Sequence, residues 1–297
     1  MQSVLFSSWK DSGRLFNEMI KVSFMLSNNL GDGVYISSLL KARKEVEIEL
    51  FFKPDRLGTV FHTLYKNLCK CSFYETYEQM KEAHPDAIES HHAIRAHGKN
   101  AHMPRLLLDY FGLFHINEIP EIPIDIADKY ASLYFVRQFK DPIILMPANC
   151  GSGDPENCYA QYRTPPFEFF QNIVDKYKSK HDFLQFGISP NTYRDGYSNF
   201  FPIKGTIKIL DLPVDILARI YSVVGKMISG DTGDAHLMVA VGGRVKMLVP
   251  RNDDVGYQHK YLHYNPSSWK GVPRVEYIGF ERLGRLDRDP TGSILNF

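Results

Sequence analysis

The sequence predicts an α/β protein of two units, in each of which helices cover a parallel β-sheet. Two observations support this prediction. Buried-strand patterns alternate with helical patterns along the chain, and the alternation starts again after the proline-rich stretch Ile119–Ile126. At 297 residues the chain is long enough for two hydrophobic cores. We therefore expect an N-terminal domain at residues 1–135 and a C-terminal domain at residues 136–297.

The first unit opens with the apolar run Ile20–Leu26, which predicts a buried strand. A loop of polar residues and glycines follows, and Val34–Arg43 then has its apolar residues at helical spacing. Val46–Phe52 predicts the next strand. Further helices are expected at residues 57–68 and at residues 103–111, the second of them closed by Gly112.

The second unit repeats this pattern. Strands are predicted at residues 142–147, 182–188 and 244–250, and helices at residues 166–180 and 213–224. Residues 226–236 predict a strand that runs into a loop. From Tyr264 onward the sequence has no clear period, and we assign no element there.

Charge and composition narrow the class of protein. Lys and Arg total 35 against 34 Asp and Glu, so we do not expect an extended nucleic-acid-binding surface. The first 16 residues lack the pattern of a secretory signal, and no run of about 18 apolar residues could span a membrane. We expect a cytoplasmic protein whose cysteines are reduced, structural thiols, namely Cys69, Cys71, Cys150 and Cys158.

The stretch Ser229–Gly243, SGDTGDAHLMVAVGG, joins a predicted strand to an apolar run compatible with a helix. Ligands of open α/β sheets bind at such junctions, beside the carboxyl ends of the strands. Gly230 and Gly233 permit close backbone approach and φ angles that other residues avoid. Free N–H groups at a helix start, with the hydroxyl of Thr232 and a ring N–H of His236, favour a phosphate.

A purely structural explanation of the same residues stays open. Asp231 or Thr232 caps the helix, and His236 packs against a neighbouring strand. The two explanations are compatible, because capping and anion binding use the same free N–H donors.

The segment from Leu210 to Pro250 resembles the C-terminal signature of glycosyltransferase family 9, the ADP-heptose:lipopolysaccharide heptosyltransferase-like proteins. The family pattern D-[ST]-G-x-x-H-[LM]-A-A-x-G stands here as DTGDAHLMVAVGG. The family's first strand, Gly-Asp loop and helix resemble SFMLSNNLGDGVYISSLLKA, and HMPRLLLDYFGL resembles a third family helix. The resemblance covers about residues 20–250.

This resemblance implies the GT-B architecture, in which two Rossmann-like domains face each other. A nucleotide-diphosphate sugar, ADP-heptose-like, would bind the C-terminal domain. An inverting transfer would move its sugar to a hydroxyl of a glycan or another acceptor on the N-terminal domain. No cofactor and no metal are expected, because the helix dipole and nearby donors can offset the charge of the leaving diphosphate. Those donor-binding residues would be Asp231, Thr232, Gly233 and His236.

The resemblance also implies that Asp32 is the general base, since the family's acid stands at this Gly-Asp position. A carboxylate there can take the proton of the attacking hydroxyl. The alternative is that Asp32 is the N-cap of the helix Val34–Arg43.

Two further donor contacts are candidates. Where the family has a lysine before Trp-Pro, the nearest counterpart here is Arg163, whose guanidinium could bind the diphosphate; the alternative is a surface arginine beside a helix start. Gly151 and Ser152 follow the first strand of the second unit and could line the donor site, or form an ordinary loop.

Two other functions are compatible with parts of the same pattern. A nucleotide-sugar 2-epimerase shares the architecture, and a non-catalytic nucleotide-binding protein would keep DTGDAH and lose the acceptor chemistry. The histidine-rich segment ESHHAIRAHGKNAH lacks the H-E-x-x-H spacing of a zinc site and predicts a polar loop. No metal ligand is therefore assigned.

Overall fold

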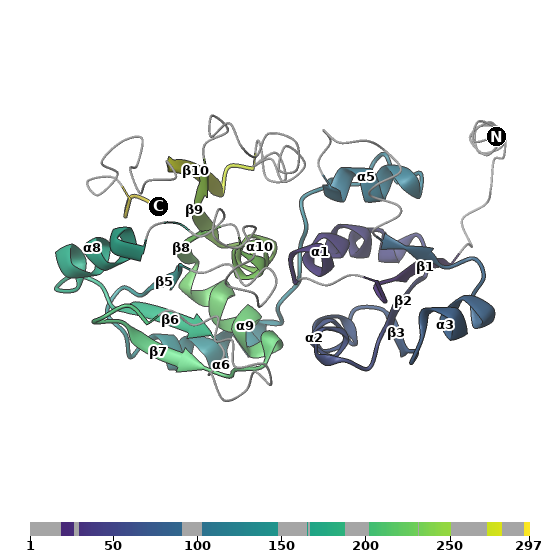
Figure 1. Cartoon of the computed structure of the whole chain (residues 1–297), viewed down its shortest axis with the longest axis horizontal. Coiled ribbons are helices and arrows are strands. Elements are labelled where there is room, and N and C mark those ends of the chain that lie inside the picture. Colours follow the sequence, from purple (N-terminus) through teal and green to yellow (C-terminus); the bar gives the residue numbers. More distant parts are fainter. Residues whose placement is uncertain are drawn as a thin grey trace.

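The structure is a computed structural model, and the residues that it describes form two parallel β-sheets with helices packed around them (Figure 1). It describes residues 19–26, 30–90, 103–147, 165, 167–187, 202–230, 232–250, 272–280 and 294–297. This arrangement confirms the predicted α/β class and the division into two sheet-containing units.

The first sheet has the strand order β3-β2-β1-β4, and all of its pairs are parallel. Its central strand β2 has the sequence IELFF and is buried along its whole length. The strands are β1 (Ile20–Ser23), β2 (Ile48–Phe52), β3 (Lys70–Phe73) and β4 (Ile88–Glu89). The helices of this unit are α1 (Leu30–Tyr35), α2 (Arg56–Tyr65), α3 (Tyr77–Ala83) and α5 (Met103–Tyr110).

The second sheet has the order β10-β9-β8-β5-β6-β7, again with parallel pairs throughout. Counted from its own first strand, this is the order of the doubly wound Rossmann sheet. The strands are β5 (Ile143–Met146), β6 (Phe183–Gly187), β7 (Ile207–Leu210), β8 (Lys226–Gly230), β9 (Arg244–Pro250) and β10 (Val275–Phe280). The helices are α6 (Ile126–Val136), α8 (Phe167–Tyr177), α9 (Val214–Val224) and α10 (Gly233–Ala240).

Local sequence explains several of the helix ends. Asp55 caps α2 by accepting a hydrogen bond from the N–H of Gly58, and Thr76 begins α3 with a capping box. Gly225 ends α9 with a φ of 67°, a left-handed conformation that favours glycine. Gly112 follows α5 with a φ of 70°, as predicted from the sequence.

The helix predicted at residues 34–43 begins earlier and changes type. Leu30–Tyr35 forms the α-helix α1, and Ile36–Lys44 continues it as a 3₁₀ helix, η1. Asp32 therefore lies within α1 rather than at an N-cap, so the capping alternative for this residue is wrong. The local apolar spacing did not locate this start, which lies in a polar, glycine-containing stretch.

Six of the elements that the structure describes were not predicted. The strand β3 lies at the edge of its sheet and is only partly buried, so its sequence KCSF lacks an apolar pattern. The strands β4 and β7 are two and four residues long. The others are α3, α6 and β10, the last of which lies in the C-terminal part that the sequence analysis left unassigned.

The helix α6 follows the proline-rich connector and packs against α9 of the second unit. An ion pair joins the two helices, with 2.9 Å between Arg219 Nη1 and Asp128 Oδ1. The domain boundary between residues 135 and 136 stays a prediction.

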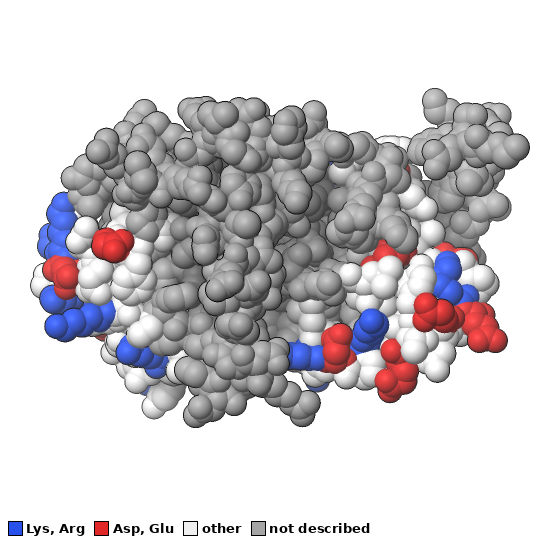
Figure 2. All heavy atoms as spheres, viewed as in Figure 1, with Lys and Arg blue, Asp and Glu red and all other residues white. Residues whose placement is uncertain are grey.

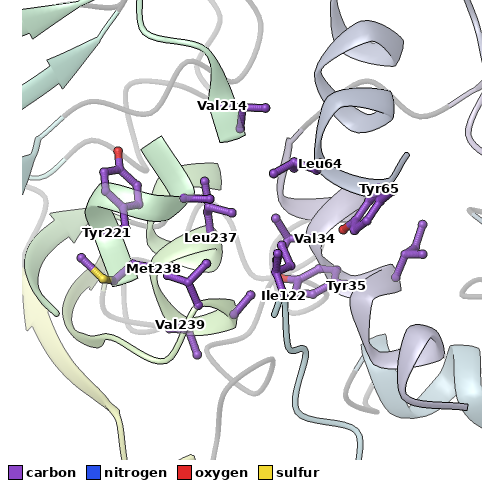
Figure 3. Close-up of a cluster of buried hydrophobic side chains, with 14 of the residues drawn as sticks. Val34, Tyr35, Leu64, Tyr65, Ile122, Val214, Tyr221, Leu237, Met238 and Val239 are labelled. Carbon is purple, nitrogen blue, oxygen red and sulfur yellow. The ribbon is translucent and has the colours of Figure 1, made fainter. Parts of the chain in front are cut away.

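The hydrophobic core is continuous from one unit to the other. Figure 3 shows Val34 and Tyr35 of α1 on one side and Leu237 and Met238 of α10 on the other, with Ile122 of the connector between them. The backbone N–H of Ile122 donates to the carbonyl of Ala240 at 2.8 Å, which ties the connector to α10. The two units are therefore packed against each other through α1 and α10.

Charged side chains on the face drawn in Figure 2 are of both signs. Lys and Arg lie among Asp and Glu at the α8 end of the molecule and again at the α2–α3 end. Among the helices that the structure describes, none combines the length and the apolar character needed to cross a membrane.

Candidate active site at the carboxyl ends of the strands

The carboxyl ends of β5 and β8 lie side by side in the second sheet. The two strands pair in parallel, with Met146 opposite Ser229, and the Ser229 hydroxyl donates to the Met146 carbonyl at 3.1 Å. After β5 the next strand along the chain, β6, lies on one side, and after β8 the next strand, β9, lies on the other. This point of strand-order reversal is where open α/β sheets bind ligands.

The DTGDAH segment occupies this point. The strand β8 ends at Gly230 and α10 begins at Gly233, which confirms the predicted strand–loop–helix placement. Thr232 is the N-cap of α10, and its Oγ1 accepts from the N–H of Ala235 at 3.1 Å. Its hydroxyl also lies 3.0 Å from Ser229 Oγ. The capping role is therefore confirmed for Thr232, which buries its side chain.

Gly233 is required by packing as well as by its place in the loop. A Cβ at this position would lie 2.7 Å from Cβ of Leu30, at the start of α1 in the other unit. Such a distance is shorter than van der Waals contact, so a larger residue would push α1 and α10 apart. Gly233 is the first residue of α10 and has no positive φ, so it does not use the wider range of φ angles that glycine permits.

His236 is buried and faces the other unit. Its ring makes an edge-to-face contact with Tyr35 of α1, with 5.2 Å between ring centroids, and Nε2 lies 3.5 Å from the Tyr35 hydroxyl. The packing alternative for His236 named a neighbouring strand, but the partner is this helix. His236 thus lies at the contact between the units, one turn into α10.

Asp234 forms a polar pair that the sequence analysis missed. The Tyr221 hydroxyl, from α9, donates to Asp234 Oδ1 at 2.8 Å. Burial raises the pKa of Asp234, and the hydrogen bond from Tyr221 opposes that rise. Burial next to this carboxyl also raises the pKa of Tyr221 well above its usual value. The pair connects the first turn of α10 to α9.

The remaining predicted site residues fall partly or wholly outside the described residues. The backbone of Asp32 lies in α1, the helix that packs against α10, but its side chain is not described. Asp231 lies between Gly230 and Thr232, outside the described residues. So do Arg163, Gly151 and Ser152, which belong to the stretch between β5 and α8.

A second carboxyl group lies at the corresponding edge of the first sheet and was also missed. Glu89 is the last residue of β4 and pairs in register with Ser23, the last residue of β1. It is 2% exposed, and Oε2 accepts from Ser23 Oγ at 2.7 Å. A single glutamate within a two-residue strand carries no sequence pattern, so only the structure reveals its burial.

Comparison with known proteins identifies the fold. A glycosyl transferase family 9 structure from Veillonella parvula DSM 2008 matches with a TM-score of 0.56 at 14% identity, covering 89% of this chain and 86% of that one. TibC from enterotoxigenic E. coli H10407, an iron-containing dodecameric glycosyltransferase, matches with a TM-score of 0.51 at 11% identity, covering 80% and 59%. The protein therefore has the GT-B fold of these glycosyltransferases, and the structural resemblance to family 9 is confirmed at the level of the fold.

TibC has also been solved in complex with ADP-D-beta-D-heptose, and that structure matches with a TM-score of 0.51. No family model matches the sequence. No curated protein matches it either.

Proposed function

We propose that the protein is an inverting glycosyltransferase that moves a sugar from a nucleotide-diphosphate sugar, ADP-heptose-like, to a hydroxyl group of an acceptor. The observation that carries this proposal is the position of DTGDAH. It stands at the strand-order reversal of the second sheet, and the helix that follows it packs against the helix that contains Asp32. The fold comparison and the sequence resemblance support the same reading.

On the donor side, the N–H groups at the start of α10 and its helix dipole would bind the diphosphate. Arg163, Gly151 and Ser152 would add contacts from the stretch after β5. Asp231 and His236 belong to the same proposed donor site. These donors would take up the negative charge that develops on the diphosphate as its bond to the sugar breaks.

On the acceptor side, Asp32 would act as the general base. The acceptor oxygen would attack the anomeric carbon while the bond from that carbon to the diphosphate breaks. The hydroxyl proton would pass to the carboxylate of Asp32. One displacement of this kind inverts the configuration of the anomeric carbon.

The first test is an assay of nucleoside diphosphate release from a panel of nucleotide sugars, run with and without EDTA. We expect release in the presence of a hydroxyl acceptor and, because the proposed site uses protein donors, no loss with EDTA. If EDTA abolishes release, the transfer is not independent of metal. This control matters because TibC is an iron-containing glycosyltransferase. Isomerised nucleotide sugar without release would indicate the epimerase, and binding without reaction the non-catalytic protein.

Two substitutions then separate the proposed roles. Asp32→Asn should lower turnover by about 10²-fold or more, with nucleotide affinity nearly unchanged, because the amide cannot accept the proton. Arg163→Ala should weaken binding of the nucleoside diphosphate by about tenfold and that of the nucleoside little, because charge-assisted hydrogen bonds to phosphate are strong. Turnover of Asp32→Asn within a few-fold of the parent protein would exclude Asp32 as the base.

A further inference from the structure

Glu89 lies beside the segment that the proposed function makes catalytic. It is the last residue of β4, and its carboxylate is held against the last residue of β1 by the 2.7 Å hydrogen bond from Ser23 Oγ. Ser23 Oγ in turn accepts from the N–H of Met25 at 3.3 Å. A chain of hydrogen bonds therefore runs from the first turn after β1 to the buried carboxyl of Glu89.

The other end of this segment is also fixed by a buried side chain. The Tyr65 hydroxyl, from α2, donates to the carbonyl of Gly33 at 2.6 Å, one residue after Asp32. A Cβ on Gly33 would collide with the ring of Phe61, so α1 is packed tightly on α2 at this point. Glu89 is thus linked to the described residues just after β1, and Tyr65 holds α1 at Gly33.

The carboxyl group of Glu89 is not fully satisfied by this arrangement. Its Oε1 is buried and has no hydrogen-bond partner within the described part of the chain. Burying an ionised carboxyl with one oxygen unpaired costs folding free energy. An apolar side chain would therefore serve a purely structural role better at this position. Its position at the carboxyl edge of the sheet gives a reason for its presence.

We propose that Glu89 is a positioning residue that, through Ser23, fixes the turn after β1 and thereby the position of Asp32. The proposal rests on the proposed function, because it needs Asp32 as the base. Glu89 touches no reacting atom in this role. It acts on the reaction only through the path of the backbone between Ser23 and α1.

The ionisation of Glu89 supplies a readout that a merely structural residue would lack. Burial raises its pKa from the ordinary 4.5 to about 7, against the opposing effects of Ser23, the N–H groups of Leu26 and Met25, and Lys53. Among the described residues the charged or titratable side chains that interact with it are Lys53, after β2, and Tyr77, on α3. Because burial disfavours the ionised form, ionisation favours any opening of the turn that hydrates this carboxyl, so the turn should be held less firmly above pH 7.

The chain provides a matched control in Glu49. This residue lies on β2 of the same sheet, is also 2% exposed, and its Oε1 also accepts from a serine hydroxyl, Ser72 Oγ at 3.2 Å. It stands near the start of its strand, away from the carboxyl edge. Glu49→Gln therefore repeats the chemical change of Glu89→Gln in a place where no effect on Asp32 is expected.

The experiment compares full-length parent protein with Glu89→Gln, Ser23→Ala and Glu49→Gln. Hydrogen exchange of the peptide covering residues 24–36 is measured at pH 6 and pH 8, corrected for intrinsic exchange. Turnover is measured with ADP-heptose as the probe. We expect Glu89→Gln and Ser23→Ala to raise exchange of this peptide and lower kcat by about tenfold each, with KM for ADP-heptose within about twofold.

Glu49→Gln should leave kcat and the exchange of that peptide within about twofold of the parent. The parent's corrected exchange should rise between pH 6 and pH 8, because the buried carboxyl ionises over this range, and that difference should vanish in Glu89→Gln. Unchanged exchange in both Glu89→Gln and Ser23→Ala would overturn the proposal. So would an equal effect of Glu49→Gln, or loosened exchange with undiminished kcat. Ser23→Ala removes the same hydrogen bond while Glu89 stays in place, so it provides the test if Glu89→Gln does not fold.

Failure of the proposed function would be recognised separately. If the parent protein turns over no nucleotide sugar, the proposed function fails, and with it the catalytic part of this inference. The exchange measurements would still decide whether Glu89 fixes the turn after β1.

Discussion

Gly233 shows how one residue can serve a site and a packing contact at once. Its place in the loop suggests that it lets a ligand approach the backbone, but the atom nearest to a Cβ at this position belongs to Leu30. Its smallness is needed because α1 and α10 meet there. The substitution Gly233→Val would therefore disturb the fold as well as any binding of a nucleotide.

Gly233→Ala should destabilise the protein by roughly 1–3 kcal/mol, the usual cost of forcing an extra carbon into a packed contact. Leu30→Gly removes the side chain that the new methyl group would meet. The double variant should therefore lose less unfolding free energy than the sum of the losses in the two single variants. Urea denaturation of the four proteins measures this coupling. If the Gly233→Ala protein is as stable as its parent, α1 and α10 can accommodate the methyl group without loss of stability, and the prediction is wrong.

Glu89 should make stability depend on pH. Its folded-state pKa of about 7 lies above the ordinary 4.5, so the stability that its neutral form contributes is present below pH 4.5 and is lost as pH rises through 7. The full loss is on the order of 3 kcal/mol. Glu89→Gln cannot ionise, so its stability relative to the parent should rise between pH 4.5 and pH 7. Parallel stability curves for the two proteins over this range would contradict the raised pKa.

At the scale of elements, the candidate site is assembled from two strand–helix junctions. The first joins β1 to α1, the helix that contains Asp32, and the second joins β8 to α10 and contains Thr232. Parallel strands bring their carboxyl ends to one edge, and α1 and α10 then pack together. The position of α10 depends on how its first turn is held.

Thr232→Val should destabilise α10 by about 1 kcal/mol, because it removes the oxygen that accepts from Ala235. Thr232→Ser keeps the hydroxyl and should stay close to the parent. Thermal melts give the stability difference, and hydrogen exchange of the α10 peptide shows where it arises. Equal melting temperatures for the serine and valine variants would mean that the cap contributes little.

At the scale of the whole molecule, the two units share one hydrophobic core. Buried residues of both sheets belong to a single cluster, which includes Val22 of β1 and Met247 of β9. Tyr35, whose ring contacts His236, belongs to this cluster. Units connected by so much apolar packing are expected to unfold together.

Calorimetry should therefore show one unfolding transition, with equal calorimetric and van't Hoff enthalpies. Val34→Asp places a carboxylate in the fully buried contact between the units and should lower the melting temperature steeply or split the transition. Phe114→Ala, at a position that is 71% exposed, is the matched control and should melt like the parent. Two separate transitions in the parent protein would contradict a shared core.

Much of the fold could be predicted from the sequence, where a local pattern was strong. The buried run of β2 and the amphipathic helix α9 were predicted because each spans a full period of its own pattern. The strands β4 and β7 were missed because two to four residues carry no period. The helix α1 was misplaced because packing on α2 and α10, rather than apolar spacing, fixes its start.

By itself the sequence determined the alternation of strands and helices, the restart after the connector, and the position of DTGDAH between a strand and a helix. These features depend on spacings of two to four residues, which a single chain displays directly. Only the tertiary structure decided that Gly233 faces Leu30, that His236 packs on Tyr35, and that Glu89 is buried against Ser23. Those pairs are 66 to 203 residues apart, and only the packing of whole elements brings such residues together.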